Sequence, residues 1–224
     1  MRLLPLIALL TGLAGPVTAQ IAPSSSEVAA YEGLFRAAHE GDVAEIERLV
    51  AAGADVDARD ARGRTPVHVA AFASEDDALR TLAEAGADMN ALEHRAYDVV
   101  TIAAVADDPE LMSLAIELGN DPGLVTSPYL GTALIAAAHL GHVEVVRRLI
   151  AAGAPLDHIN NLHWTAVMEA VVLGDGGPDH QAVLDALLSA GADRSLSDRD
   201  EIKPLQHAEA RGFDEMVERL RRKD

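Results

Sequence analysis

The sequence contains no cysteine and few aromatic residues, and each scarcity narrows what the chain can be. Without cysteine there can be no disulfide, thiol nucleophile, cysteine-based zinc site or lipid-modified cysteine anchor. Aromatic residues make up only 3% of the chain, whereas hydrophobic residues make up 49%. Because sheet sandwiches favour aromatic and β-branched residues, this composition favours a core of small residues between helices.

Basic residues are also scarce, with 18 Lys and Arg against 36 Asp and Glu and a formal net charge of −18. An acidic surplus of this size repels phosphate backbones, so we expect no nucleic-acid partner. The same charge favours a protein partner with a basic face and speeds the encounter between the two at low salt.

The first nineteen residues have the pattern of a secretory signal peptide. Met1 and Arg2 give a positive start, an apolar run extends from Leu3 to Leu13, and Val17-Thr18-Ala19 resembles a cleavage site. A membrane anchor is the alternative, but the apolar run is shorter than the roughly 20 residues that a span needs. We predict cleavage after Ala19, a linker over 20–29, no membrane span in the mature chain, and a periplasmic or secreted location.

Two sequence markers recur through the rest of the chain at the same period. Gly-Ala-Asp or a variant of it begins at positions 53, 86, 119, 153 and 191, which are 33, 33, 34 and 38 residues apart. Thr-Pro or a variant of it begins at positions 65, 98, 132, 165 and 203. Two markers that stay in phase over five periods indicate a structural repeat.

Each repeat has the pattern of helix, turn, helix and loop. Between Thr132 and Gly153, two stripes of apolar residues at helical spacing are separated by Gly141-His142. Gly153 stands where a helix ends in a left-handed residue. Helices this short are marginal alone, so neighbouring units must bury each other's stripes. We predict six units near 30–56, 60–89, 93–122, 127–156, 160–194 and 198–224, together forming one domain over 30–224, with the two end units as caps.

Two segments resemble ankyrin repeats closely: Asp60 to Ala71, which contains Thr65-Pro66-Val67-His68, and Gly141 to Ala154. The resemblance extends from Tyr31 to Leu220. It implies a mostly α fold, an ankyrin-repeat solenoid of about six stacked helix-turn-helix units joined by β-hairpin-like finger loops.

Two units depart from the ankyrin pattern. In the third, Asp98-Val99 replaces Thr-Pro, Asp107 replaces the turn glycine and Ala96 replaces the finger glycine. Its second helix still has a cap in Asp108 and a proline at its first position, Pro109. The fifth unit carries extra residues around 174–178, between its two helices, which are either idle or a second contact site.

The resemblance implies a non-enzymatic protein–protein interaction module that is monomeric in isolation. It would bind through the finger loops and the exposed face of each first helix, as a scaffold or stabiliser, or as an inhibitor or immunity protein. Aromatic and arginine side chains carry much of the binding energy at interfaces. The alternative is that the rings here pack on the neighbouring finger and stabilise the stack. The predicted partner-binding residues are Arg62, Arg64, Phe72, His94, Arg95, Tyr97, Tyr129, Leu130, His139, Leu162 and Trp164.

Nine histidines raise the alternative of a His-based metal-binding protein or enzyme. His139 and His142 have a spacing that suits one metal ion, but the resemblance explains His142 and His68 as structural hydrogen-bonding residues. The sequence contains no His-Glu-x-x-His, Gly-x-Ser-x-Gly or Gly-x-x-x-x-Gly-Lys motif. We therefore expect no catalytic residue, metal or cofactor. A secreted effector directed at a host is a further alternative.

One polar pair stands out in an otherwise apolar column of the repeats. Glu169 and His207 occupy the position that Val69, Ile102 and Ala136 fill in other units. We predict that they form an ion pair that bridges the last two units and stabilises the C-terminal end more below pH 7 than above it.

Overall fold

The computed structural model describes residues 20–222. Within this range the chain forms thirteen helices and no strand, apart from an isolated bridge between Thr126 and Gly131. The predicted signal peptide, residues 1–19, lies outside the described residues. The helices are α1 Ser25–Ala29, α2 Gly33–Glu40, α3 Val43–Ala51, α4 Pro66–Ala73, α5 Asp76–Glu84, α6 Val99–Ala106, α7 Pro109–Glu117, α8 Ala133–Leu140, α9 Val143–Ala151, α10 Ala166–Val172, α11 Pro178–Ser189, α12 Pro204–Arg211 and α13 Asp214–Arg221.

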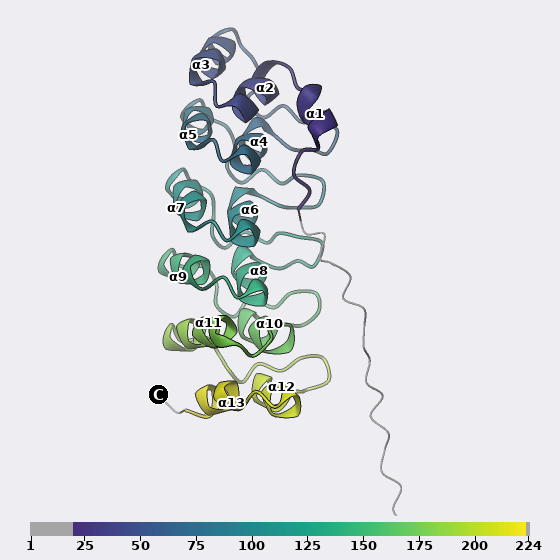
Figure 1. Ribbon diagram of the computed structural model, residues 1–224, viewed down its shortest axis with the longest axis vertical. Helices are drawn as coiled ribbons and strands as arrows, with labels where there is room; N and C mark the ends of the chain where they lie inside the picture. Colours follow the sequence, from purple (N-terminus) through teal and green to yellow (C-terminus); the bar gives the residue numbers. More distant parts are fainter. Residues whose placement is uncertain (1–19, 223–224) are drawn as a thin grey trace, which may run out of the picture.

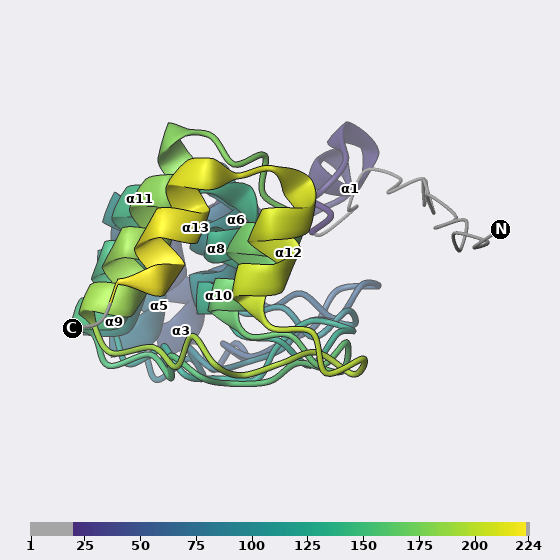
Figure 2. The same cartoon turned by 90° about the horizontal axis from the view of Figure 1, so that it is seen from below.

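Six pairs of helices stack along one axis, from α2 and α3 at one end to α12 and α13 at the other (Figure 1). The first helices of the pairs form one layer and the second helices form another, and each first helix packs on its neighbours in the same layer. Among the second helices, α3 packs on α5, and α7, α9, α11 and α13 pack in succession. The loops between pairs extend past the layer of first helices on one side of the stack (Figure 2). The predicted fold, a solenoid of six helix-turn-helix units, is confirmed.

Side-chain caps explain why the first helices begin where they do. Thr132 and Thr165 each accept a hydrogen bond from the backbone N–H three residues later. In the third unit, where threonine is absent, the carboxylate of Asp98 accepts from the N–H of Thr101 at 2.8 Å. Asp108 caps α7 in the same way, at 2.8 Å from the N–H of Leu111, as predicted. The departures from the repeat pattern therefore keep the capping chemistry.

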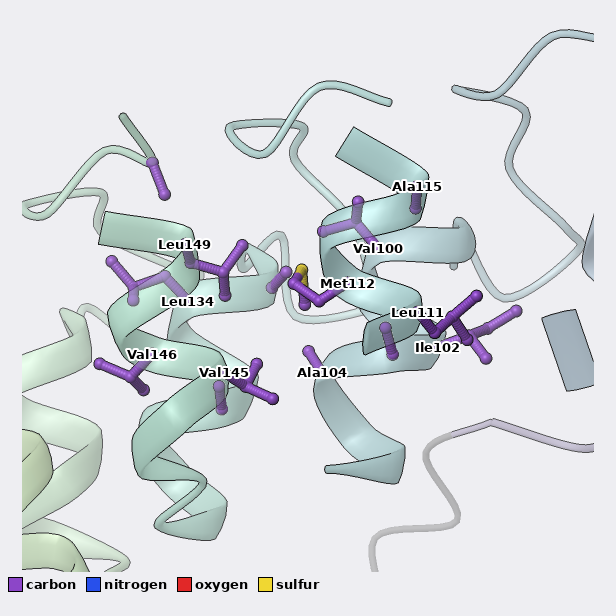
Figure 3. Close-up of a cluster of buried hydrophobic side chains, with 14 of the residues drawn as sticks. Val100, Ile102, Ala104, Leu111, Met112, Ala115, Leu134, Val145, Val146 and Leu149 are labelled. Atoms are coloured by element: carbon purple, nitrogen blue, oxygen red, sulfur yellow. The ribbon is translucent and has the colours of Figure 1, made fainter. Parts of the chain in front are cut away.

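The hydrophobic core runs along the stack, between the two helix layers and between successive pairs. Figure 3 shows Leu111 and Met112 of α7, and Val145 and Leu149 of α9, among the buried side chains of the third and fourth pairs. Each fully buried side chain of this kind stabilises the fold by about 1.5–3 kcal/mol relative to exposure. Since these side chains contact the next pair as well as their own, a pair gains much of its stability from its neighbours.

The finger loops are hairpins that hydrogen-bond to one another. Within the fourth finger, the N–H of Asn160 donates to the carbonyl of Trp164 at 3.0 Å. Backbone bonds also link neighbouring fingers, so the loops form a continuous surface that the helices hold in place. These bonds run from His94 N–H to Arg62 O, from Ser127 N–H to Ala96 O and from Asn161 N–H to Tyr129 O.

The insertion of the fifth unit, 173–177, packs against the sixth unit. The guanidinium of Arg211 donates to the carbonyls of Val172 and Gly174 and lies 4.5 Å from the ring centre of Phe213. A Cβ atom on Gly176 would lie 2.6 Å from that ring, so only glycine fits there. The insertion is therefore a structural corner between the last two units.

Candidate functional site

Two of the predicted partner-binding arginines contact the chain's own N-terminal segment. Helix α1 lies within the segment predicted as a linker, and Glu27 at its first turn pairs with Arg62 at 2.8 Å and with Arg64 at 2.9 Å. Arg64 also donates to the backbone carbonyl of Ile21. Residues 21–27 therefore cover the first finger, on the side where a partner was expected.

Arg64 is 1% exposed, and the prediction that it faces a partner is wrong. Its Nε atom lies 2.7 Å from a carboxylate oxygen of Asp60, four residues earlier in the same finger. Burial alone would raise the pKa of Asp60, but hydrogen bonds from Arg64 and Arg62 outweigh it and hold this pKa below its usual value. Together Glu27 and Asp60 satisfy the buried guanidinium, as a buried charge requires.

Histidines 68 and 142 are structural, as predicted. Nδ1 of His68 lies 2.8 Å from the hydroxyl of Thr65, and its Nε2 lies 3.0 Å from the carbonyl of Tyr97 in the next finger. Burial lowers the pKa of His68 to about 4, so the ring is neutral at physiological pH. Nδ1 of His142 lies 2.8 Å from the carbonyl of Ala104 in the preceding unit. Both rings therefore tie one repeat to another.

The possible metal pair, His139 and His142, does not converge on one point. Nδ1 of His142 contacts the carbonyl of Ala104, whereas His139 lines a cavity to which His142 does not contribute. In the described range 20–222, no group of three or more His, Cys, Asp or Glu is placed to hold a metal ion. The same range contains no helix long and apolar enough to cross a membrane.

A cavity of about 340 Å³ lies between the fingers and the first helices of the third, fourth and fifth units. Helices α6, α8 and α10 form its base, through residues such as Thr101, Ile135 and Glu169, and the fingers close it from the side. Five of the predicted partner-binding residues line it: Tyr97, Tyr129, His139, Leu162 and Trp164.

The predicted binding residues differ in how far they reach solvent. Tyr97 is only 5% exposed, so its ring is a wall of the cavity and is not presented at the finger surface, which corrects the prediction for this residue. Tyr129 and Leu130 are 50% and 57% exposed. Outside the cavity lining, Phe72 packs against the core and Arg95 is half-buried, while the exposed His94 covers Gly63 of the preceding finger.

Exposed apolar side chains gather around this cavity. Seven of the eight large hydrophobic residues that are exposed in the described chain lie on two neighbouring fingers and two helix ends. Four of them also line the cavity, so its mouth is apolar. The seven are Val125, Tyr129, Leu130, Leu140, Ile159, Leu162 and Leu173.

The predicted ion pair between Glu169 and His207 is wrong. Nε2 of His207 lies 2.7 Å from a carboxylate oxygen of Asp198, nine residues earlier in its own unit. Glu169 instead points into the cavity, where its Oε1 accepts a hydrogen bond from Nδ2 of Asn160 at 2.9 Å. The acceptor for His207 is Asp198 in its own finger, so Glu169 has no ion-pair partner in the sixth unit.

Glu169 is an acid in an apolar setting. Its side chain is 5% exposed, and its second oxygen, Oε2, has no hydrogen-bond partner among the described residues. Burial raises the pKa of Glu169 to about 7, although the hydrogen bond from Asn160 opposes the shift. Perturbed acids in concave sites are frequent at functional positions. The sequence marked this residue by its polar character in an apolar column but did not assign it to a site.

Comparisons with known proteins agree with the repeats seen here. Models of ankyrin repeats match residues 34–76, 62–94 and 100–198. A relative named as an ankyrin repeat protein, YahD of Escherichia coli (strain K12), is 32% identical over 185 residues, which cover 82% of this chain and 92% of the relative.

Solved structures show the same fold. An ankyrin repeat domain from Acinetobacter baumannii AYE has a TM-score of 0.78 and 41% identity, and the match covers 84% of this chain and 95% of that one. A chain from the complex between the predatory endopeptidase Bd0816 of Bdellovibrio bacteriovorus and the immunity protein Bd3460 has a TM-score of 0.70 and 22% identity, covering 87% and 99%. At that identity the second match shows the fold alone.

Proposed function

This chain belongs to the ankyrin-repeat family, whose repeats indicate protein–protein interaction, and we propose that it is an exported, non-enzymatic module that binds one protein partner over its third to fifth units. The observation that carries this proposal is the concentration of exposed apolar side chains around the cavity between 125 and 173. A contiguous apolar surface of this kind marks an interaction site or else promotes aggregation.

The arrangement of polar and apolar groups supports a protein as the occupant. The fingers present Tyr129, Leu130 and Leu162 from neighbouring hairpins that are held in register by backbone hydrogen bonds. Because the surface is already formed, little conformational entropy is lost on binding. Tyrosine and tryptophan are enriched at interface hot spots, and Tyr129 and Trp164 both line the cavity.

The first finger takes no part in this proposed surface, because the segment 21–27 already covers it. The net charge of −18 favours a partner with a basic face and disfavours nucleic acid. We propose that the chain is monomeric without its partner.

Export rests on the sequence pattern of residues 1–19, and the periplasm or the outside of the cell is the location that we propose. The partner would then be another exported protein. Two roles fit such a binding mode: stabilising an exported enzyme, or occluding it as an inhibitor or immunity protein. A chain of this fold occurs in the Bdellovibrio endopeptidase complex, at an identity that supports a shared fold only.

The proposal is tested by capture from the exported protein fraction, with the chain from Gln20 onward as bait. We expect one protein to be retained by the wild type and lost with the double variant Tyr129→Ala/Leu162→Ala. Ile21→Ala is the matched control, because Ile21 is the one large apolar residue exposed outside the cluster within residues 20–222. Equal capture by all three baits would place the binding surface elsewhere, and retention of nothing would contradict the proposal.

A second measurement separates the two roles. If the captured protein is an enzyme, an inhibitor would lower its activity in proportion to the amount of complex. A stabiliser would leave the activity intact and slow its loss on heating. Fractionation with an antibody against the mature chain tests export, and recovery of the uncleaved chain from the cytoplasm alone would contradict it.

A further inference from the structure

The base of the cavity contains a carboxylate that the rest of the chain leaves half satisfied. Oε1 of Glu169 accepts one hydrogen bond, from Asn160, while Oε2 is buried without a hydrogen-bond partner in the described range 20–222, in a side chain that lines the cavity. A buried acceptor left unpaired costs about 1–3 kcal/mol, and more if it is charged. Such a group either lowers the stability of the fold or is paired by a hydrogen-bond donor of a bound molecule.

The chain offers no cation for this position. No lysine or arginine is among the described residues that line the cavity. On the helices packed against α10, the charged or titratable side chains are His139 on α8, Asp179, His180 and Asp185 on α11, and His207, Glu209 and Arg211 on α12. The guanidinium of Arg211 donates to the carbonyls of Val172 and Gly174. Of the histidines, Nδ1 of His139 lies 3.6 Å from Oε2, beyond hydrogen-bonding distance, while His180 contacts Asp175 and His207 contacts Asp198.

The rest of the cavity suits an apolar stem. Tyr97, Tyr129 and Trp164 supply aromatic faces, and Leu162 and Leu173 flank the mouth. Aromatic faces attract ammonium and guanidinium groups as well as aliphatic chains. The volume of about 340 Å³ is at the small end for ligand sites, enough for one long side chain and the backbone that carries it.

We propose that the cavity receives one lysine or arginine side chain of the bound protein, with its cationic head at the carboxylate of Glu169 and its stem against Tyr97 and Trp164. This inference rests on the proposed function and adds the chemistry that the site recognises. A neutral apolar side chain would fill the same space but leave Oε2 unpaired, so the cavity prefers the cation. The acidic charge of the whole chain favours the same partner chemistry.

The recognition depends on the protonation of Glu169. A cation binds the ionised carboxylate, whereas the protonated acid offers only a neutral contact. Since burial raises the pKa of Glu169 to about 7, binding should strengthen as the pH rises from 6 to 8. The pKa of His139 is lowered by burial and by His180, which favours the neutral ring and weakens its competition for the carboxylate.

The cavity is tested first without any partner, by its own fluorescence. Trp164 is the single tryptophan of the chain and lines the cavity, so its emission reports occupancy. The probes are hexylammonium chloride and 1-hexanol, which share a stem and differ in charge. We expect hexylammonium to bind wild type about tenfold more tightly than Glu169→Gln at pH 8, since an ionic hydrogen bond is lost.

Three comparisons sharpen that result. Hexanol should bind wild type and Glu169→Gln alike, and Glu169→Gln should abolish the rise of hexylammonium affinity between pH 6 and 8. The variant keeps an oxygen for the bond from Asn160, so folding is preserved. Glu47→Gln, on the exposed face of α3, removes the same charge at the other end of the stack and should bind hexylammonium as wild type does.

The partner arm uses the captured protein. If Glu169→Gln weakens its capture about tenfold at pH 8 while the Ile21→Ala control does not, the inference is supported. If hexylammonium and hexanol bind equally, or Glu169→Gln changes neither, the cavity chemistry is wrong, while protein binding through Tyr129 and Leu162 stands. If only the partner ignores Glu169→Gln, the assignment of its lysine or arginine to this cavity is overturned.

Discussion

Nδ1 of His139 and Oε2 of Glu169 face each other across 3.6 Å without a hydrogen bond, one from α8 and the other from α10. Burial pushes both groups towards their neutral forms. It raises the pKa of Glu169 to about 7, and together with His180 it lowers the pKa of His139. Two groups that would form an ion pair in water are thus both discouraged from charging here.

Stability should fall with rising pH because of Glu169. The unfolded chain releases this proton near pH 4.5, whereas the native state holds it until about pH 7. The stability that Glu169 contributes is therefore complete below pH 4.5 and is lost as the pH rises through 7, by about 3 kcal/mol in total. Glu169→Gln should remove this loss, so that its advantage over wild type in urea unfolding grows between pH 5 and 8.

His68 is the reason to measure that difference and not wild type alone. Its pKa is lowered to about 4, so acidification between pH 6.5 and 4 destabilises the native state and opposes the trend from Glu169. The two proteins share His68, and its contribution cancels when one curve is subtracted from the other. Parallel curves would show that the pKa of Glu169 is not raised.

Glu27→Ala should release the N-terminal segment from the first finger. Glu27 pairs with Arg62 and Arg64, and its pKa is lowered to about 2, first by hydrogen bonds with Ser24 and then by Arg62. Losing it should reduce the free energy of opening α1 by about 1–3 kcal/mol. Hydrogen exchange of residues 25–29 would report the change, with Glu32→Ala as the control. Unchanged exchange would mean that other contacts hold the segment.

Ala96→Gly should stabilise the chain. Ala96 has φ of 60° at the tip of its finger, where the first finger has Gly63 with φ of 78°. A left-handed residue with a Cβ atom costs about 1 kcal/mol relative to glycine. We expect a rise of about 2–4 °C in the thermal midpoint. Gly63→Ala should lower it, since a Cβ atom there would also meet the His94 ring at 2.4 Å.

Gly174→Ala should disrupt the corner between the last two units. The added Cβ atom would lie 2.1 Å from the backbone carbonyl of Ala170, and backbone cannot yield as a side chain can. We expect a loss of about 2 kcal/mol or more. Gly177→Ala is the control, because its closest neighbour is the flexible Asp175 carboxylate and its φ of −74° suits any residue. Equal losses would argue against a backbone clash as the cause.

The fold could be predicted because every repeat carries its own local signals. Caps such as Thr132, turn glycines such as Gly141 and two apolar stripes act within about thirty residues, and the period multiplies them. The third unit shows the same chemistry with other residues, for instance Asp98 in place of threonine. Local physics thus tolerates substitutions that keep the hydrogen bond.

The site was predicted in part, and the errors have one cause. The column before each first helix was expected to face outward, but in it Arg64 and Tyr97 turn in between finger and helix. Glu27, which pairs with Arg64, lies outside the repeats, so the repeat pattern could not predict this ion pair. Glu169 was recognised as anomalous, yet its actual contact, Asn160, is one that only the folded finger brings near. Exposed Tyr129, Leu130 and Leu162 were found because loop position alone decides their exposure.

The stacking of the pairs also says how the molecule should yield to force. Each pair touches only its neighbours along the axis, from α2 and α3 to α12 and α13 (Figure 1). Tension applied at the two ends would therefore unfold the terminal pairs one after another, in several small steps and not in one cooperative event. The cavity is lined by the third, fourth and fifth pairs, so it would stay folded while the outer pairs unfold. A partner bound at the cavity would therefore stay bound after the first or the last pair had unfolded.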